Sequence, residues 1–272
     1  MKVSVLMPTY NHSATIAQAI DSFLAQKCCF DIQLLISDDA STDATLSIAR
    51  KYESENHDKI VVITKPENEG LIANYRTLVS RAEGEYLAVL ESDDYWSDPL
   101  KLQKQIDFLD ANADYGLSFT RVMFLQEGVL REDYDYSELL ESLQGELYSY
   151  MLLRSIIYSP TVVFRRNLFE KYCNIDEYVD GRFITFDYPV WLSILAHSKV
   201  HYLSDATAVY RVQSSSISNT GNLRKRLDFE KSIAECRSYV TAKYGTGNIW
   251  LAKIKAREAL LLCRIIWRYL FR

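Results

Sequence analysis

The 272-residue chain contains only nine glycines, and they form no recognisable phosphate-binding loop. Neither G-x-x-x-x-G-K-S/T nor G-x-G-x-x-G occurs, which excludes a P-loop and a dinucleotide-binding fingerprint. Any phosphate groups that this protein binds must therefore be held by metal ions and side chains.

Cysteine and long apolar runs are also scarce. The chain has five cysteines, Cys28, Cys29, Cys173, Cys236 and Cys263. An odd number without C-x-x-C spacing favours reduced thiols in a cytosolic protein over a disulfide framework or a zinc site. No run of 18 uncharged apolar residues occurs, and an apolar strand follows Met1 and Lys2 directly. We therefore expect neither a membrane-spanning helix nor a signal peptide.

Charge is spread unevenly along a chain of otherwise ordinary globular composition, with 48% hydrophobic and 25% charged residues. The net charge is −5, but residues 223–272 carry 12 Lys/Arg and 4 Asp/Glu, a balance of +8 that leaves −13 for the rest. The length fits one large α/β domain, or one domain with an appendage. An acidic body with a basic tail suggests that the tail meets something anionic.

Segments with the period of a strand alternate with segments of helical period through the first 90 residues. We expect strands at 2–8, 30–37, 59–65 and 85–90, and helices at 9–26, 42–56 and 74–83. This alternation is typical of βαβ units, which build a largely parallel sheet with right-handed crossovers. Ligands bind such sheets beyond the carboxyl ends of the strands.

Polar motifs follow three of the expected strands: PTYN at 8–11, SDDAST at 37–42 and ESDD at 91–94. Taken alone, ESDD has a simpler explanation as an acidic surface turn. Such a turn would not require the other two motifs, however, and all three should lie along one crevice at the same edge of the sheet. The pattern favours a binding site.

The carboxylates of Glu91, Asp93 and Asp94 suit a hard divalent cation. Mg²⁺ or Mn²⁺ takes one or two carboxylates and completes its coordination with phosphate oxygens and water. Such a cation would offset the repulsion between the acids and would connect them to a diphosphate.

Six motifs occur in a characteristic order: PTYNH (8–12), SDDASTD (37–43), NEGLIANYR (68–76), GEYLAVLESDDYWSDPLKLQKQ (84–105), FDYPVWLSILA (186–196) and VYRVQSSSIS (209–218). Together they resemble the family 2 glycosyltransferases with the GT-A fold. The resemblance implies an α/β fold, with a Rossmann-like, mostly parallel sheet flanked by helices. It also implies a GT-A domain at 1–220, with a nucleotide-binding half (1–110) and an acceptor half (111–220), and a basic helical extension at 221–272.

The implied activity is inverting transfer of a sugar from a nucleotide-diphosphate sugar, expected to be UDP-linked, to a saccharide or lipid-linked acceptor. The resemblance implies Mn²⁺ or Mg²⁺ as the cofactor and a role in bacterial surface-polysaccharide assembly. It implies no nucleic-acid partner. By resemblance, the nucleotide-sugar site comprises Pro8, Thr9, Tyr10, Asn11, Asp38, Asp39, Asn68, Gly70, Asn74, Glu91, Ser92, Asp93 and Arg211.

Individual roles also follow from the resemblance. Thr9 and Tyr10 would line the base, and Asp38 would accept a hydrogen bond from its edge. Asp39 would assist or fix the turn, and Asn11 is equally well explained as a turn former. Tyr95 and Trp96 are more readily explained as core or as acceptor-side wall than as chemistry.

Asp93 is the first choice as metal ligand, with Asp94, Glu91 and Gln213 beside it. Many family members carry Asp at the position of Glu91 and His at the position of Gln213. Glutamine offers a neutral oxygen, a weaker ligand than imidazole for Mn²⁺ but acceptable for Mg²⁺. Arg211 and residues 214–216 would then take over contacts to the diphosphate.

Asp187 precedes an apolar helical segment with Val190, Trp191, Ile194 and Leu195 on its inner side. Its residue type alone favours a helix N-cap. The family places its catalytic base here, at the start of a helix under the acceptor, so the resemblance implies that Asp187 is the general base. The two roles are compatible.

Residues 250–272 have the pattern of a helix with a broad apolar face and a narrow basic stripe of Lys253, Arg257, Arg264 and Arg268. The helix either packs on the domain or lies on an anionic membrane, with Trp267 at headgroup depth. A cytoplasmic enzyme, peripheral on the inner face of the cell membrane, would suit a lipid-linked acceptor.

Two other functions fit parts of the pattern. A sugar-nucleotide nucleotidyltransferase also uses an α/β sheet, acids and Mg²⁺, but it should have a Gly-rich basic loop after the first strand, and PTYNHSAT is not one. A sugar-nucleotide-binding module without turnover is the other alternative, to which Gln213 points.

Overall fold

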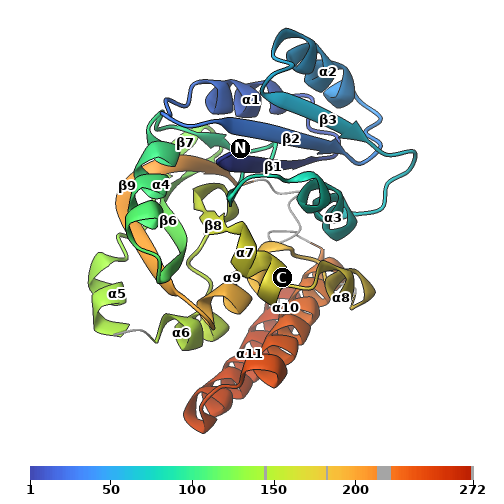
Figure 1. Ribbon diagram of the computed structural model, residues 1–272. Coiled ribbons are helices and arrows are strands. Elements are labelled where there is room, and N and C mark those ends of the chain that lie inside the picture. Colours follow the sequence, from blue (N-terminus) through green and yellow to red (C-terminus); the bar gives the residue numbers. More distant parts are fainter. Residues whose placement is uncertain (144–145, 182, 213–221, 271–272) are drawn as a thin grey trace.

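The computed structural model describes residues 1–143, 146–181, 183–212 and 222–270. These residues form a nine-stranded mixed sheet with helices on both faces and a pair of long helices below it (Figure 1). The predicted α/β fold with a C-terminal helical extension is confirmed.

The first four strands form the predicted parallel sheet. They are β1 (Val3–Thr9), β2 (Ile32–Asp38), β3 (Ile60–Thr64) and β4 (Tyr86–Val89). Their order in the sheet is β3-β2-β1-β4, and all three pairings are parallel. Because β1 lies in the middle, every one of its side chains is buried, and the hydroxyls of its two polar residues, Ser4 and Thr9, are hydrogen-bonded.

Four helices cover the two faces of this half. They are α1 (Ile16–Leu24), α2 (Thr45–Glu55), α3 (Leu71–Arg81) and α4 (Lys101–Ala111). Alternate residues of β1 point into different layers: Val5 packs in the core that α1, α2 and α4 share, and Leu6 packs in the core that contains α3. Both faces of the sheet are therefore buried, as expected for βαβ units.

The remaining strands make the sheet mixed. They are β5 (Tyr95–Trp96), β6 (Tyr115–Gln126), β7 (Val129–Glu132), β8 (Val163–Arg165) and β9 (Lys199–Arg211). Strand β8 pairs antiparallel with β4 and with β6, β6 pairs parallel with β9, and the short β5 pairs antiparallel with β9. The parallel expectation thus holds for β1 to β4. Beyond β4 the sheet continues through antiparallel pairings and the parallel pair of β6 and β9, so one continuous sheet spans the chain from residue 3 to residue 211.

Shorter helices connect these strands: α5 (Ser137–Leu143), α6 (Leu147–Leu153), the 3₁₀ turn η1 (Ser159–Thr161), α7 (Arg166–Tyr172), α8 (Ile175–Asp180) and α9 (Asp187–Leu195). Helix α9 is buried along almost its whole length, with Trp191 fully enclosed. A helix that is apolar all round belongs in a core. Its first turn therefore has a fixed position beneath the sheet.

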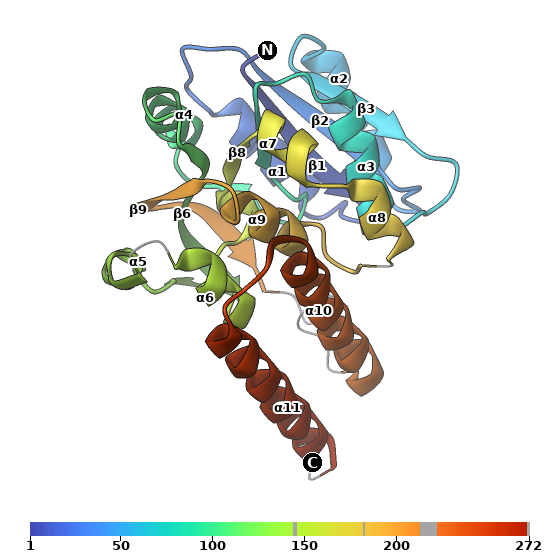
Figure 2. The same cartoon turned by 60° about the horizontal axis from the view of Figure 1, so that its bottom comes forward.

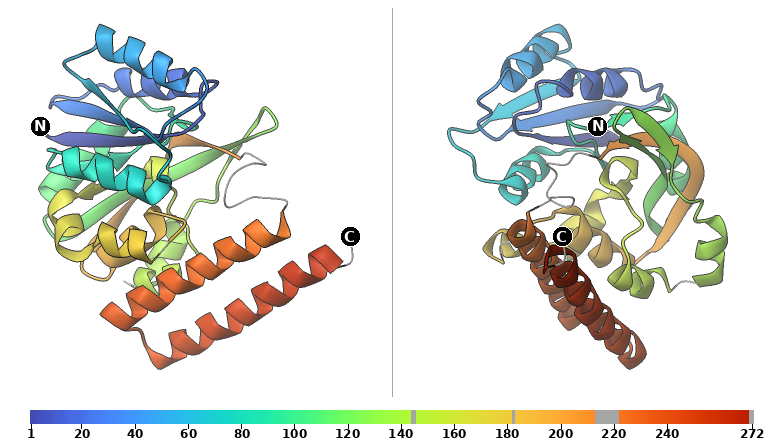
Figure 3. Two further views of the ribbon diagram at one scale, coloured as in Figure 1. Left: turned by 90° about the vertical axis from the view of Figure 1, so that its right-hand side faces the viewer. Right: turned by 180° about the vertical axis from the view of Figure 1, so that it is seen from behind.

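The basic extension forms a helical hairpin of α10 (Leu223–Tyr244) and α11 (Asn248–Leu270). Figures 2 and 3 show the two helices side by side, running in opposite directions below the body. Gly245 ends α10 at a φ of 79°, a conformation that suits glycine. Ile233, Cys236 and Val240 of α10 and Ile254 of α11 are buried in the core that includes α9. Within the described residues, no helix is long and apolar enough to cross a membrane.

Candidate active site

A cavity of about 780 Å³ opens where the carboxyl ends of the parallel strands face α9 and the helical hairpin. Its wall includes Pro8, Thr9 and Tyr10 after β1, Asp39 after β2, and Glu91 and Asp93 after β4. Residues that follow three different strands therefore meet at one edge of the sheet, as the strand-end motifs predict.

The three acids after β4 form a compact cluster. Glu91, Asp93 and Asp94 each offer a carboxylate oxygen, and these oxygens lie within 4.8 Å of one another. The backbone N–H of Asp94 donates to the carbonyl of Glu91 at 3.0 Å, which closes the turn. The turn is followed at once by β5, so it is fixed on both sides by sheet pairing.

The cluster is electrostatically strained. Burial, together with the carboxylates of Asp93 and Asp187, raises the pKa of Glu91 to about 8. Burial and the same cluster raise the pKa of Asp94 well above its ordinary value. Burial is the largest cause of both shifts and repulsion between the acids adds to it, and a cation bound among the acids would relieve that repulsion. Such shifts are typical of functional sites.

The geometry and donor chemistry fit a divalent cation. Asp94 is buried, and its Oδ2 has no hydrogen-bond partner, so a hard-acceptor oxygen is left unsatisfied inside the cluster. Carboxylate oxygens are the ligands that Mg²⁺ and Mn²⁺ prefer. Glu91, Asp93 and Asp94 are therefore the residues that could hold the ion. Gln213, the fourth expected ligand, and residues 214–216 lie outside the described residues.

Arg211, the last residue of β9, holds the acidic turn in place. Its backbone N–H donates to Asp94 Oδ1 at 2.8 Å, and its guanidinium donates to the carbonyl oxygen of Asp93 and to the side chain of Gln18. The guanidinium also lies over the ring of Tyr95, 4.9 Å from its centre. In this conformation the side chain supports the turn from behind and is not part of the cavity wall.

Two of the expected nucleotide-binding residues fix loops. Asn11 has a positive φ of 57°, and its Oδ1 accepts from the backbone N–H of Thr42 at 2.8 Å, which joins the loops after β1 and β2. Asp39 accepts from the backbone N–H groups of Glu69 and Gly70 at 3.0 and 2.8 Å. Asp39 therefore positions the start of α3, where Gly70 itself adopts a φ of 89°.

A buried hydrogen-bond network lies beneath the first loop. Ser92 Oγ donates to Thr9 Oγ1 at 2.8 Å and lies 2.7 Å from Nδ1 of His12. This network ties the end of β1 to the acidic turn. Nearby, Asp38 Oδ1 and Asn74 Oδ1 are buried without hydrogen-bond partners, so two acceptors remain for the donor groups of a ligand.

Asp187 is the first residue of α9, and Phe186 occupies the N-cap position without a side-chain cap bond. The Asp187 carboxylate accepts from Ser159 Oγ at 3.2 Å and from the backbone N–H of Tyr188 at 2.8 Å. It lines the cavity, and burial raises its pKa. A carboxylate with a raised pKa is a stronger base near neutral pH.

Tyr75 of α3 connects the acidic cluster to α9. Its hydroxyl donates to Glu91 Oε1 at 3.0 Å, and its ring stacks on Phe186 with centroids 3.9 Å apart and planes at 8°. Phe186 directly precedes Asp187. One fully enclosed aromatic side chain therefore positions both the cluster and the start of α9.

The helical hairpin supplies the opposite charge. Arg237 of α10 is 7% exposed, and its Nε donates to the Tyr188 hydroxyl at 3.1 Å. Its Nη1 pairs with Glu258 of α11 at 3.1 Å. Arg237 and Arg257 both line the cavity. The cavity thus has an acidic wall at the sheet and basic side chains at the hairpin.

The family model for "Glycosyl transferase family 2" matches residues 4–173 of this chain. The chain belongs to glycosyltransferase family 2. It is also 32% identical over 219 residues to TuaG of Bacillus subtilis, which is named as a teichuronic acid biosynthesis glycosyltransferase. That match covers 80% of this chain and 81% of TuaG. Membership of this family is what the six motifs predict.

Other relatives of this chain differ in the share of each chain that the alignment covers. The uncharacterised protein Rv1520 of Mycobacterium tuberculosis is 37% identical over 165 residues, 60% of this chain and 47% of that protein. The chain thus spans about half the length of this relative. The glucosyltransferase WfaP of Escherichia coli, named for a UDP-Glc donor and a GlcNAc-diphosphoundecaprenol acceptor, is 29% identical over 218 residues, 79% of each chain.

Solved structures of low sequence identity share the fold of this chain. S. aureus TarS in complex with UDP-GlcNAc superposes with a TM-score of 0.67 at 21% identity, over 94% of this chain and 72% of that one. The mannosyltransferase PcManGT of Pyrobaculum calidifontis, in complex with GDP-Man and Mn²⁺, gives 0.66 at 19% identity, over 98% and 71%. The similarity confirms the GT-A fold.

The cavity of this chain brings most of the expected residues together. Those that line it are Pro8, Thr9, Tyr10, Asp39, Asn68, Gly70, Asn74, Glu91, Asp93 and Asp187. Asn11, Ser92, Asp94 and Arg211 lie outside this wall and are held by the contacts described above, and Asp38, also outside it, accepts from the backbone N–H of Ser41 at 3.0 Å. Trp96 is core, since it is 4% exposed and its Nε1 donates to the carbonyl of Pro160 at 2.8 Å.

Sequence reasoning missed several residues that line the cavity, among them His12, Tyr75, Arg237 and Arg257. His12 and Tyr75 belong to the PTYNH and NEGLIANYR motifs, so their position in these motifs was a usable signal. Arg257 was expected on a basic stripe facing solvent or membrane. It is more than a third exposed, yet it lies at the cavity. The side chains of Arg264 and Arg268 lie outside the described residues.

Proposed function

We propose that this glycosyltransferase is a metal-dependent, inverting enzyme that uses a nucleotide-diphosphate sugar. The observation that carries the proposal is the presence of the Glu91–Asp93–Asp94 cluster and the buried carboxylate of Asp187 at one cavity. The cluster suits a metal-bound diphosphate, and Asp187 suits a base. A glycosyl transfer by single displacement requires both of these parts and no further nucleophile.

The donor side of the cavity is formed by the loops after β1, β2 and β4. Thr9 and Tyr10 would line the base, and the unsatisfied oxygens of Asp38 and Asn74 would accept hydrogen bonds from it or from the ribose. We expect a UDP-sugar, in line with the UDP-GlcNAc bound by TarS, while the GDP-Man complex of PcManGT shows that the fold accepts another nucleotide.

Glu91, Asp93 and Asp94 would hold Mn²⁺ or Mg²⁺, with Asp93 as the principal ligand. When bound, such an ion supplies Lewis-acid stabilisation of the negative charge that develops on the leaving diphosphate. Arg211 keeps the turn rigid, so the carboxylates do not need to reorganise as that charge develops.

Asp187 would accept the proton of the acceptor hydroxyl as that oxygen attacks the anomeric carbon. Its bonds from Ser159 and from the Tyr188 N–H orient the carboxylate. The acceptor attacks from the side opposite the leaving diphosphate, so the anomeric centre is inverted. The acceptor is a saccharide or a lipid-linked saccharide, as the name of WfaP states for that relative.

The test removes the principal metal ligand. Asp93→Asn keeps the size of the side chain. In Mn²⁺ it should abolish both sugar transfer and the slow background hydrolysis of the donor. Its affinity for UDP in Mn²⁺ should fall to the value that wild type shows in EDTA. Asp107→Asn, on the exposed side of α4, is the matched control and should behave like wild type. If wild type binds UDP equally well with and without chelator, the metal-dependent mechanism is wrong.

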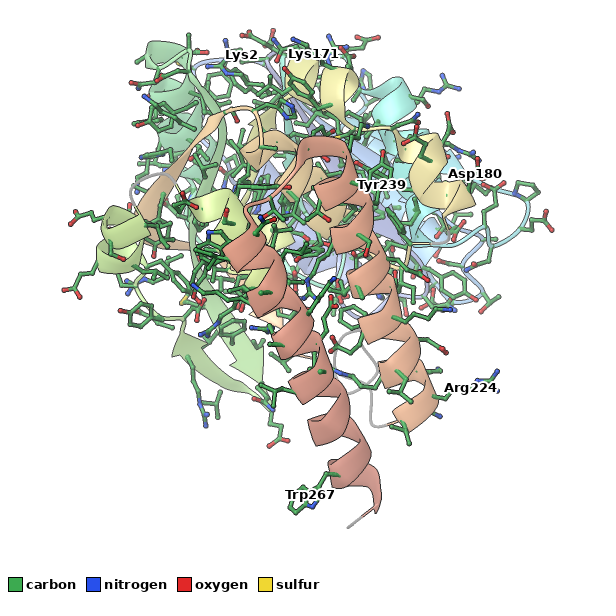
Figure 4. The ribbon with its side chains drawn as sticks, turned by 90° about the horizontal axis from the view of Figure 1, so that it is seen from below. Lys2, Lys171, Asp180, Arg224, Tyr239 and Trp267 are labelled. Atoms are coloured by element: carbon green, nitrogen blue, oxygen red, sulfur yellow. The ribbon has the colours of Figure 1, made fainter. Side chains whose placement is uncertain are left out.

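We also propose that the helical hairpin attaches the enzyme reversibly to an anionic membrane, on the cytoplasmic side. The +8 balance of residues 223–272 supports this, since each Lys or Arg near such a surface contributes about 1 kcal/mol. Leu260 and Trp267 of α11 are 61% and 64% exposed. Figure 4 shows Trp267 near the end of α11 that projects past the body, and Arg224 near the corresponding end of α10.

Co-sedimentation with vesicles that contain anionic lipid tests this attachment. Ile254 is buried in the core, so deleting α11 would destabilise the protein, and the full chain is used instead. We expect binding at low salt, loss of binding at 1 M salt, and weaker binding of Leu260→Ser/Trp267→Ser. The control is Val129→Ser/Leu130→Ser on the β6–β7 hairpin, where both side chains are about half exposed. Equal binding of both double variants would assign the attachment to another surface.

A further inference from the structure

The hairpin places two arginines at the cavity wall, one enclosed and one at the surface. Arg237 is 7% exposed and is held by Tyr188 and Glu258. Arg257, on the next helix, is more than a third exposed. Burial and repulsion by the guanidinium of Arg237 lower the pKa of Arg257. Two like charges therefore lie close together at one end of the cavity.

The carboxylates nearby do not balance this charge. Glu258 pairs with Arg237 at 3.1 Å, and Glu230, which also lines the cavity, pairs with Arg226 at 2.6 Å. Among the described side chains, Arg257 makes no ion pair. Arg154, exposed at the end of α6, adds a further charge that repels Arg257. An anion bound between the arginines would relieve this repulsion.

Apolar side chains share the cavity with the arginines. Leu153 of α6 and Phe229 and Ile233 of α10 line the same cavity. A site for a free inorganic anion does not need such a lining, whereas a site for an anion attached to an apolar chain does. Guanidinium groups bind phosphate oxygens in a bidentate fashion, and two of them match the multiple charges of a diphosphate better than the single charge of a carboxylate.

We infer that Arg237 and Arg257 bind the diphosphate of a lipid-linked acceptor. The inference rests on the proposed function and adds to it the acceptor class and the residues that recognise it. Tyr188, which contacts Arg237, is the neighbour of Asp187 in the first turn of α9. A diphosphate at Arg237 would therefore hold its attached sugar close to the first turn of α9, which carries the base.

The test measures binding of a short, water-soluble prenyl diphosphate in the presence of EDTA. The chelator removes metal-dependent binding at the acidic cluster. Binding of a prenyl alcohol, which lacks the diphosphate, and of inorganic pyrophosphate, which lacks the apolar chain, is measured in parallel up to saturating concentrations. We expect Arg257→Gln to weaken binding of the prenyl diphosphate about 10-fold. Lys255→Gln, which removes an equal charge from the exposed surface of the same helix, should leave it unchanged.

Arg237→Lys provides a second variant, which keeps the charge and loses the planar fork. We expect it to weaken binding about 5-fold or more, with its melting temperature recorded to show that it is folded. Unchanged affinity in folded Arg237→Lys and in Arg257→Gln would overturn the inference. Equal affinity for inorganic pyrophosphate would also overturn it, because the apolar chain would then play no part.

Donor hydrolysis in Mn²⁺ separates this inference from the proposed function. Lys255→Gln, the control on the exposed surface of α11, should hydrolyse the nucleotide sugar at the wild-type rate. If the diphosphate binds without dependence on either arginine while donor hydrolysis proceeds and requires Asp93, only the acceptor assignment fails. If wild type neither hydrolyses nor transfers any nucleotide sugar, the proposed function fails, whatever the arginines bind.

Discussion

The charged side chains at the two ends of the cavity have different kinds of hydrogen-bond partner. At the sheet, carboxylates are held by groups without a formal charge: Glu91 by a tyrosine hydroxyl, Asp94 by a backbone N–H and Asp187 by a serine hydroxyl. At the hairpin, the buried Arg237 is held by a carboxylate, that of Glu258. Among the described residues, the first arrangement gives these three carboxylates no ion pair, whereas the second pairs the charge of Arg237 and leaves that of Arg257 unpaired.

The difference shows what each end contributes. Acids that are buried without an opposite charge lower stability. A protein retains them where a ligand, here a cation, supplies that charge. The arginine–glutamate pair instead joins α10 to α11 and contributes to the fold of the hairpin. Removing one carboxyl charge should therefore have opposite effects on stability at the two ends.

The largest expected effect concerns chemistry at the sheet end. Asp187→Asn preserves the size of the side chain and an acceptor oxygen for the Tyr188 N–H, and its amide N–H can donate to Ser159 Oγ, but it removes the basicity. We expect kcat for transfer to fall by about 10²- to 10⁴-fold, with donor binding and melting temperature near those of wild type. Asp176→Asn, in the first turn of the exposed α8, is the control and should keep full activity. Retention of most activity by Asp187→Asn would make this residue purely structural.

A smaller effect is expected at the hairpin. Glu258→Gln leaves the guanidinium of Arg237 buried beside a neutral amide. Because the Glu258 side chain is 34% exposed, we expect a loss of about 1–2 kcal/mol, less than for a fully buried pair. Urea unfolding monitored by circular dichroism measures it. Glu235→Gln, which breaks an exposed pair on α10, should change stability by no more than about 0.5 kcal/mol. An equal loss in both variants would show that burial of Arg237 is unimportant.

The smallest expected effect has the opposite sign. Asp94→Asn removes a buried acid from the cluster and retains an oxygen for the Arg211 N–H, so we expect metal-free protein to gain about 0.5–1 kcal/mol in stability. The same variant should respond less to added Mn²⁺, because one ligand is weaker. Both effects are read from melting temperatures with EDTA and with Mn²⁺. A less stable metal-free variant would contradict the view that this end of the cavity is strained.

The sheet end could be predicted from the sequence because backbone topology determines it. Parallel strands present their carboxyl ends at one edge, so PTYN, SDDAST and ESDD had to meet once the strands were recognised. The antiparallel pairing of β8 was not anticipated. Only three residues long, it carries too little pattern to be separated from its neighbours.

The hairpin end could not be predicted in the same way. Periodicity shows that residues 250–272 are helical, but it does not say which side of the helix meets the body. Arg257 and Lys255 are equally plausible surface residues in the sequence, and only the packing of Ile254 turns Arg257 toward the cavity. The burial of Arg237 depends on α9 and α11 together, through Tyr188 and Glu258. Such contacts are tertiary and have no local signature.

The hydrogen bond between Tyr75 and Glu91 has a consequence for variation within the family. Many members carry aspartate where this chain has Glu91, and the additional methylene of glutamate is what brings its carboxylate within 3.0 Å of the Tyr75 hydroxyl. A shorter acid would leave that enclosed hydroxyl without its acceptor. Positions 75 and 91 should therefore covary, with tyrosine accompanying glutamate and phenylalanine or another apolar residue accompanying aspartate. Exchanging only one member of the pair should be poorly tolerated by either kind of enzyme.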